Sequence, residues 1–271
     1  MKLSEVGELG LLEELERLGL IAGTQHDAAE LERGLVVTQD ALVEGVHFRL
    51  DRMSWRELGF RAAAVNISDL AASAARPQAL LVTLAVPTDT GLESVVELYK
   101  GLAAAGVPVR GGDTTRAEEV VVSVTAVGRS ERVPGRAGAR PGDAVVVTGP
   151  LGAAGAAFRA GAYVRPPIRV DEGLRLGPVA TAMLDVSDGL AVDAGHMARR
   201  SGCRLVLDLD AVPCAGTIDD LGFGEDFELL AAVPPGGSLD FPVIGRVEAG
   251  EGILLLRAGA PYDLPGYEHF V

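Results

Sequence analysis

The stretch Ser54–Ala72, SWRELGFRAAAVNISDLAA, indicates the fold class of this chain. Ser54 followed three residues later by Glu57 is a capping box, which opens helices because each side chain satisfies a free backbone N–H of the first turn. The apolar residues that follow predict a largely buried helix that runs towards Leu70. Within this apolar stretch stands Asp69, and burying an unpaired carboxylate costs several kcal/mol.

Apolar runs on both sides of this helix predict β-strands, and helical patterns alternate with them. Strands are expected at Leu35–Thr38, Leu80–Val86, Val120–Val127, Ala144–Thr148, Arg204–Leu209, Phe227–Val233 and Ile253–Arg257. Further helices are expected near residues 11–18, from a capping box at Thr90 and Glu93 to about Ala105, around Ala153–Ala160, and from Asp188 as N-cap to Arg200 with Gly202 as the stop. This alternation predicts a mixed α/β (α+β) protein.

The segment Arg132–Asp143, RVPGRAGARPGD, is rich in proline and glycine and is the best candidate for a domain boundary. A chain of 271 residues is long enough for one large or two medium domains. We therefore predict two mixed α/β domains, residues 1–134 and 135–271.

Composition excludes some classes of function. The formal net charge is −14, with 38 acidic against 24 basic residues, which argues against binding to nucleic acids or anionic membranes. The sequence contains neither a signal peptide nor an uninterrupted apolar run of about 18 residues, so we expect a cytoplasmic protein. Cys203 and Cys214 lack the spacing of a metal site.

Acidic residues stand at the ends of apolar segments in six places. They are Asp27, Asp40, Asp69, Asp113, Asp185 with Asp188, and Glu225 with Asp226. Any one of them is explained more simply as a helix cap or turn former. Six together favour a cation site, because Mg²⁺ prefers oxygen ligands and bridges carboxylates to substrate phosphates.

Glycine-rich phosphate loops do not explain this chain. The pattern G-x-x-x-x-G-K-[ST] is absent, which excludes a P-loop enzyme. Gly149, Gly152 and Gly155 have the spacing G-x-x-G-x-x-G, which differs from the dinucleotide fingerprint and indicates close packing of a helix on a strand.

Eight segments, in order and over nearly the whole chain, resemble the thiamine-monophosphate kinases. They are TQDALVEGVHF (38–48), AVNISDLAA (64–72), RGGDTTR (110–116), GRAGARPGDAVVVTG (135–149), RPPIR (165–169), LDVSDGL (184–190), GEDFEL (224–229) and GYEHF (266–270). The wider family also holds aminoimidazole ribonucleotide synthetase, selenophosphate synthetase and a hydrogenase-maturation protein. The resemblance implies two α/β domains, the N-terminal one pairing with its copy in a homodimer through a barrel-like interface beside which ATP binds.

The resemblance also implies an activity: Mg²⁺-dependent transfer of the γ-phosphate of ATP directly to thiamine monophosphate, giving thiamine diphosphate and ADP. The acceptor is a phosphate whose second pKa is about 6, so no acid–base residue is required. Two alternatives stay open: a sibling ATP-dependent enzyme that acts on another acceptor, and a non-catalytic nucleotide-binding relative. His26, in place of a usual acid, and Gln39, in place of a usual threonine, are the departures that support the second alternative.

Site residues are carried over from the resemblance position by position. The implied metal ligands are Asp27, Thr38, Gln39, Asp40, Asp69, Asp113, Asp185 and Asp188, and the implied nucleotide contacts are Gly112, Asp113, Arg136 and Ser187. The implied contacts to thiamine monophosphate are His47, Glu225 or Asp226, and Tyr267 or Phe270.

Overall fold

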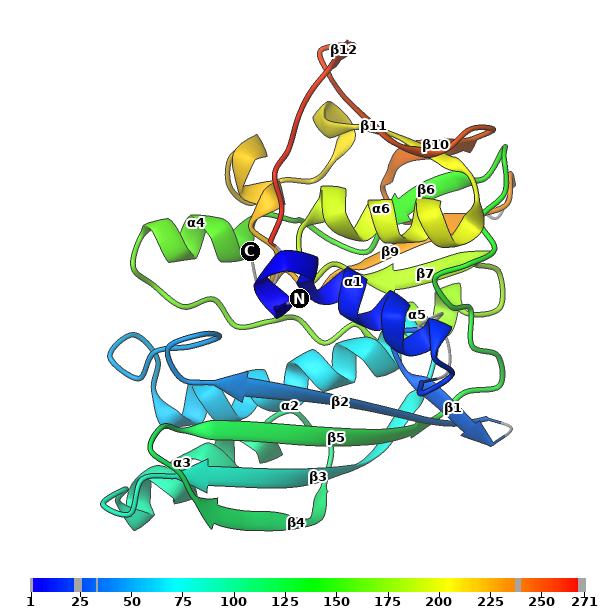
Figure 1. Ribbon diagram of the computed structural model, residues 1–271. Helices are drawn as coiled ribbons and strands as arrows, with labels where there is room; N and C mark the ends of the chain where they lie inside the picture. The colour runs from blue at the N-terminus through cyan, green and yellow to red at the C-terminus, as the bar shows by residue number, and fades with distance from the viewer. Residues whose placement is uncertain (1, 22–25, 33, 237–239, 268–271) are drawn as a thin grey trace.

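The computed structural model describes residues 2–21, 26–32, 34–236 and 240–267 (Figure 1). The helices are α1 (Leu3–Arg17), α2 (Trp55–Ala72), α3 (Leu92–Ala103), α4 (Ala153–Arg159), α5 (Val170–Leu176) and α6 (Leu190–Ser201). The strands are β1 (Ala29–Glu32), β2 (Leu35–Val43), β3 (Arg76–Val86), β4 (Val109–Arg116), β5 (Val121–Arg129), β6 (Ala144–Val147), β7 (Ala182–Asp185), β8 (Arg204–Asp208), β9 (Leu229–Val233), β10 (Val243–Glu248), β11 (Gly252–Arg257) and β12 (Ala260–Pro261). Within these ranges, no helix is long and apolar enough to cross a membrane.

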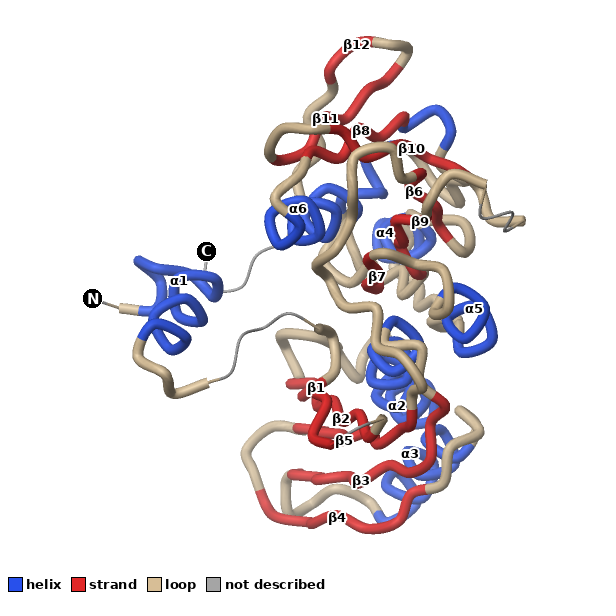
Figure 2. Tube along the Cα trace, turned by 90° about the vertical axis from the view of Figure 1, so that its right-hand side faces the viewer, coloured by secondary structure: helices blue, strands red, loops and turns tan. Residues whose placement is uncertain are grey.

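The first sheet has the strand order β1-β2-β5-β3-β4 and lies in the lower half of Figure 1. Its pairs are antiparallel except β3 with β4, which is parallel. Helices α2 and α3 both lie on one side of this sheet (Figure 2). They pack closely because Gly59 and Gly101 have no side chain; a Cβ at Gly59 would lie 1.9 Å from the carbonyl oxygen of Leu98.

The second sheet has the order β12-β11-β8-β10-β6-β9-β7, in which only β8 and β11 are parallel neighbours. Helix α2 also packs against this half of the molecule. Its last turn, at Ala71 and Ala72, packs in one cluster with Leu176, Met183 and Leu229. Residues from both halves of the sequence therefore meet along α2.

The expected mixed α/β fold and the capping box of α2 are confirmed: Ser54 accepts a hydrogen bond from the Glu57 N–H, and Glu57 reaches back to the Ser54 N–H. Gly202 ends α6 in the left-handed conformation, as predicted. The division at residues 134 and 135 and the barrel-like dimer interface stay predictions.

Two predicted caps are wrong. The N-cap of α3 is Gly91, without a side-chain cap, so Thr90 and Glu93 form no capping box. Asp188 does not cap α6, whose N-cap is Gly189. The backbone N–H groups of Asp188 and Gly189 instead donate to the carboxylate of Asp193, one turn into the helix.

Several elements carry no pattern that the sequence analysis recognised: β1, β4, β7, β10 and α5. Strand β4, for example, is an edge strand exposed at every residue from Arg110 to Arg116, so it lacks the alternation that marks a half-buried strand.

Candidate active site

A cleft of about 1100 Å³ lies between the two halves of the chain. Its walls come from β2, the loop at residues 45–53, α2, α4, the turn after β7, the segment 219–227 and the C-terminal segment at residues 265–267. The implied site residues that line it are Asp27, Thr38, Gln39, Asp40, His47, Asp69, Arg136, Asp185, Ser187, Asp188, Glu225 and Tyr267.

Four aspartates from separate elements converge at one end of this cleft. Asp40 is two residues from Thr38 on β2, so the two side chains share a face of the strand. The Thr38 hydroxyl donates to Asp69 on α2 over 2.5 Å. Asp185 ends β7 and accepts a hydrogen bond of 2.6 Å from Ser68, and Asp27 precedes β1. We name Asp27, Asp40, Asp69 and Asp185 the aspartate cluster.

Burial and mutual repulsion make the charged form of this cluster costly. Burial, with the nearby charge of Asp27, raises the pKa of Asp40 to about 6 and that of Asp185 to about 7. Burial and the Asp40 charge raise the pKa of Asp69 well above its usual range. Burial also raises the pKa of Asp27, although its ion pair with Arg136, at 2.6 Å, opposes the shift.

The cluster fits a hard divalent cation. Carboxylate oxygens of Asp27, Asp69 and Asp185 lie within 4.8 Å of one another. Oδ2 of Asp27 is buried without a hydrogen-bond partner among the described residues. Among the described residues, one arginine beside four buried or half-buried carboxylates leaves negative charge uncompensated, and oxygen-only ligands suit Mg²⁺.

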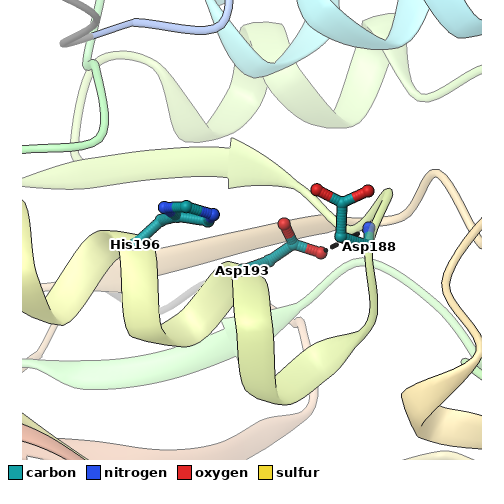
Figure 3. Close-up of side chains that lie close together, drawn as sticks. All are labelled: Asp188, Asp193 and His196. Carbon is teal, nitrogen blue, oxygen red and sulfur yellow. Dashed lines mark hydrogen bonds between the residues drawn. The ribbon is translucent and has the colours of Figure 1, made fainter. Parts of the chain in front are cut away.

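A second group of possible ligands, Asp188, Asp193 and His196, lies at the start of α6 (Figure 3), and Asp188 lines the same cleft as the first group. Asp193 and His196 project from the same side of the helix. Burial and the charge of Arg136 lower the pKa of His196 to about 4, so its imidazole is neutral near pH 7 and able to bind a cation. Asp193 and His196 were not predicted from the sequence, although their helical spacing after Asp188 is a signal that could have identified them.

Two implied residues of β4, Gly112 and Asp113, do not reach this cleft. Strand β4 is separated from β2 by β3 and β5, and both residues are exposed on that edge strand. A Cβ at Gly112, whose φ is 147°, would lie 1.8 Å from the carbonyl oxygen of Val82, so close strand packing alone requires glycine there.

Other residues of the same cleft differ chemically from the aspartate cluster. Nδ1 of His47 accepts the Val43 N–H at 3.0 Å, which places the proton of a neutral imidazole on Nε2. Buried Arg61 on α2 forms an ion pair with Glu225 from the C-terminal half. Tyr163 lines the same region, and burial raises the pKa of its hydroxyl, which therefore stays protonated. Neither Arg61 nor Tyr163 was predicted from the sequence as a site residue.

The remaining implied contacts differ in placement. The carboxylate of Asp226 is buried and accepts the N–H groups of Gly152, at 2.7 Å, and Ala154, at the start of α4. It is absent from the cleft lining, so within the described structure it stabilises the fold. Tyr267 lines the cleft mouth, and its N–H donates to the Asp188 carbonyl at 3.0 Å. Phe270 lies outside the described residues.

Comparisons with known proteins agree on one family. The model of the AIR synthase related protein N-terminal domain matches residues 25–130, and that of the C-terminal domain matches residues 140–255. The thiamine-monophosphate kinase of Aquifex aeolicus is 32% identical and is covered, like this chain, over its whole length. That of Pyrococcus horikoshii is 34% identical over 87% of this chain and 86% of its own. A solved structure, AaThiL complexed with AMPPCP and TMP, matches with a TM-score of 0.90, 32% identity and 99% coverage of both chains.

Proposed function

Since the chain belongs to the AIR synthase related protein family and, within it, to the thiamine-monophosphate kinases, we propose that it transfers the γ-phosphate of ATP to thiamine monophosphate. The products are ADP and thiamine diphosphate. The observation that carries this proposal is the aspartate cluster at one end of the cleft, with His47 and the Arg61–Glu225 pair lining the same cleft. The likeness to the AaThiL complex with AMPPCP and TMP supports it.

The aspartate cluster, with the Thr38 hydroxyl and an oxygen of Gln39, would hold Mg²⁺, and Asp188 a further ion. Bound Mg²⁺ would offset the negative charge of both phosphate chains and of the leaving ADP oxygen. Among the protein's own groups, Arg136 and Ser187 line the cleft next to the cluster and would contact the nucleotide phosphates. Arg136 is held in place by its ion pair with Asp27.

The protein has to position the acceptor phosphate rather than remove a proton from it. The acceptor phosphate is largely ionised near pH 7, because its second pKa is about 6. His47 can donate from Nε2 to this phosphate while its Nδ1 stays bound to the Val43 N–H. Glu225 and Tyr267, which also line the cleft, would contact the organic part of the acceptor.

A second copy of the chain would complete the site. Strand β4 offers an exposed edge for pairing, and Leu81 on the adjoining strand β3 is 43% exposed, on the face that α2 does not cover. A homodimer built on this edge and face would give Gly112 and Asp113 a role at the ATP site, which they do not reach within one chain. A cytoplasmic location stays a prediction from the sequence.

An acceptor panel tests the proposal. The enzyme is incubated with ATP and Mg²⁺ and with thiamine monophosphate, thiamine or no acceptor, and products are separated by chromatography. Thiamine diphosphate should form only from the monophosphate. ATP binding without any diphosphate would favour the alternatives, a sibling enzyme with another acceptor or a non-catalytic nucleotide-binding relative.

A further inference from the structure

The end of the cleft opposite the aspartate cluster is built around Arg61. Arg61 as a whole residue is only 6% exposed, although its side chain carries a permanent charge. It precedes Asp69 by eight residues on the same helix, which places the two about 12 Å apart along the axis. That spacing is comparable with the length of an extended phosphorylated thiamine, so a phosphate at the cluster would place the far ring near Arg61.

Unsatisfied polar atoms collect at this cleft. Within the part of the chain that the structure describes, three buried side-chain atoms lack a hydrogen-bond partner: Oδ2 of Asp27, Nε of Arg61 and the hydroxyl of Tyr163. All three residues line the cleft. Because a buried polar atom without a partner costs free energy, such atoms in one cleft indicate that a ligand supplies the missing partners.

Glu225 is held in a strained loop that faces the same end. Its φ is 58° and that of Phe227 is 52°, values that non-glycine residues rarely adopt. The loop is fixed by the hydrogen bond from the Glu225 N–H to the Ser187 carbonyl at 2.7 Å and by the ion pair with Arg61. A strained backbone conformation persists only where surrounding contacts hold it in place, and such conformations are typical of binding sites.

We propose that Arg61 and Tyr163 are the residues that select the acceptor by its aminopyrimidine ring. This inference rests on the proposed function. An aminopyrimidine presents an amino donor beside a ring-nitrogen acceptor. Arg61 holds one oxygen of Glu225, so that the other accepts the amino group, and the Tyr163 hydroxyl donates to the ring nitrogen. Arg61 is thus a positioning residue, and Tyr163 contacts the ring after a small adjustment that exposes its buried hydroxyl.

The test measures binding by calorimetry, with AMPPCP and Mg²⁺ present, of two ligands: thiamine monophosphate and its thiazole phosphate fragment, which lacks the aminopyrimidine. Tyr163→Phe removes only the hydroxyl and should weaken binding of thiamine monophosphate about tenfold while leaving the fragment unchanged. Tyr99→Phe, on α3 outside the cleft, is the matched control and should change neither. Equal effects of Tyr163→Phe on both ligands, or no effect on either, would overturn the assignment of Tyr163.

Arg61 is tested with the same two ligands. Arg61→Lys keeps the charge and should retain part of the preference for thiamine monophosphate, whereas Arg61→Met should abolish it. If Arg61→Met weakens both ligands equally, Arg61 is structural and the inference fails. Should the wild-type protein bind thiamine monophosphate more tightly than the fragment yet form no diphosphate, the proposed function fails while this inference stands. A wild-type protein without that preference refutes this inference even if turnover is normal.

Discussion

Ser68 on α2 donates a hydrogen bond of 2.6 Å to the carboxylate of Asp185 at the end of β7, across 117 positions of sequence. The next residue of α2, Asp69, receives the Thr38 hydroxyl from β2. One turn of α2 therefore joins the two halves of the molecule at the point where four buried or half-buried carboxylates lie together. This arrangement is costly without cations, and the predictions below follow from that cost.

Asp69→Asn should lower the rate of thiamine diphosphate formation at least about 100-fold, because it removes a proposed Mg²⁺ ligand and the charge that would offset the cation. The protein without Mg²⁺ should be as stable as the wild type or more so, since a buried carboxylate with a raised pKa is replaced by a neutral amide. Product chromatography and thermal unfolding measure the two effects. Asp89→Asn, at an exposed position outside the cleft, is the control; near-normal turnover in Asp69→Asn would refute the metal assignment.

The stability of the metal-free protein should fall as pH rises from about 4 to about 7.5. Burial raises the pKa of Asp40 to about 6 and that of Asp185 to about 7, whereas in the unfolded chain both lie near 3.8. A raised carboxyl pKa favours the protonated folded form. The loss of stability is therefore absent below the pKa of the unfolded chain and is complete once pH exceeds the pKa of the folded protein.

Mg²⁺ should remove this pH dependence. Its stabilising effect in thermal unfolding should be larger at pH 7.5 than at pH 5, where protons compete for the same carboxylates. A metal-free unfolding temperature that is flat across this range, with Mg²⁺ equally effective at both ends, would show that the cluster does not carry buried charge.

Tyr163→Phe should leave the free energy of unfolding of the unliganded protein unchanged or raise it by up to about 1 kcal/mol, because the lost hydroxyl is buried without a partner. If the Tyr163 hydroxyl instead makes a structural hydrogen bond, Tyr163→Phe should lower the free energy of unfolding. Chemical denaturation of the wild type and the variant, both without ligands, decides between them.

Asp226→Ala should destabilise the protein by about 1–3 kcal/mol, because the N–H groups of Gly152 and Ala154 lose their acceptor at the start of α4. Asp226→Asn keeps one acceptor oxygen and should recover part of this loss. Denaturant titrations measure these changes in the free energy of unfolding. The preference for thiamine monophosphate over its thiazole fragment should persist in Asp226→Asn. A loss of that preference without a loss of stability would instead place Asp226 in contact with the acceptor.

The proposed homodimer should have a mass of about twice 28.0 kDa, and Leu81→Asp should convert it into monomers because it puts a charge on the uncovered face of the first sheet. Sedimentation velocity measures the masses. The exposed substitution Leu92→Asp, at the start of α3, provides a control that should stay dimeric. A wild-type monomer with full activity would remove the role proposed for Asp113.

The sequence predicted the parts of the molecule that depend on local patterns. The capping box at Ser54 and the buried course of α2 follow from residues a few positions apart. The convergence of Asp27, Asp40, Asp69 and Asp185 was implied by the resemblance, and their shared apolar surroundings already pointed to a cation site.

Other features depend on tertiary contacts that no local pattern encodes. Arg61 and Glu225 are 164 positions apart, and Tyr163 lies in an irregular loop between α4 and α5. Asp188 stands where the sequence predicts a helix cap. In the structure, the carboxylate of Asp193 instead accepts the N–H groups of Asp188 and Gly189 at the start of α6. Strand β4 was missed because an exposed edge strand has no buried face to impose alternation.

The central claim is direct transfer from ATP to thiamine monophosphate, and ³¹P NMR of the complete reaction tests it most directly. With enzyme, ATP and Mg²⁺, the single resonance of thiamine monophosphate should give way to the two coupled resonances of thiamine diphosphate, in step with ADP and without inorganic phosphate. An unchanged thiamine monophosphate resonance, or ADP accompanied only by inorganic phosphate, would contradict the account.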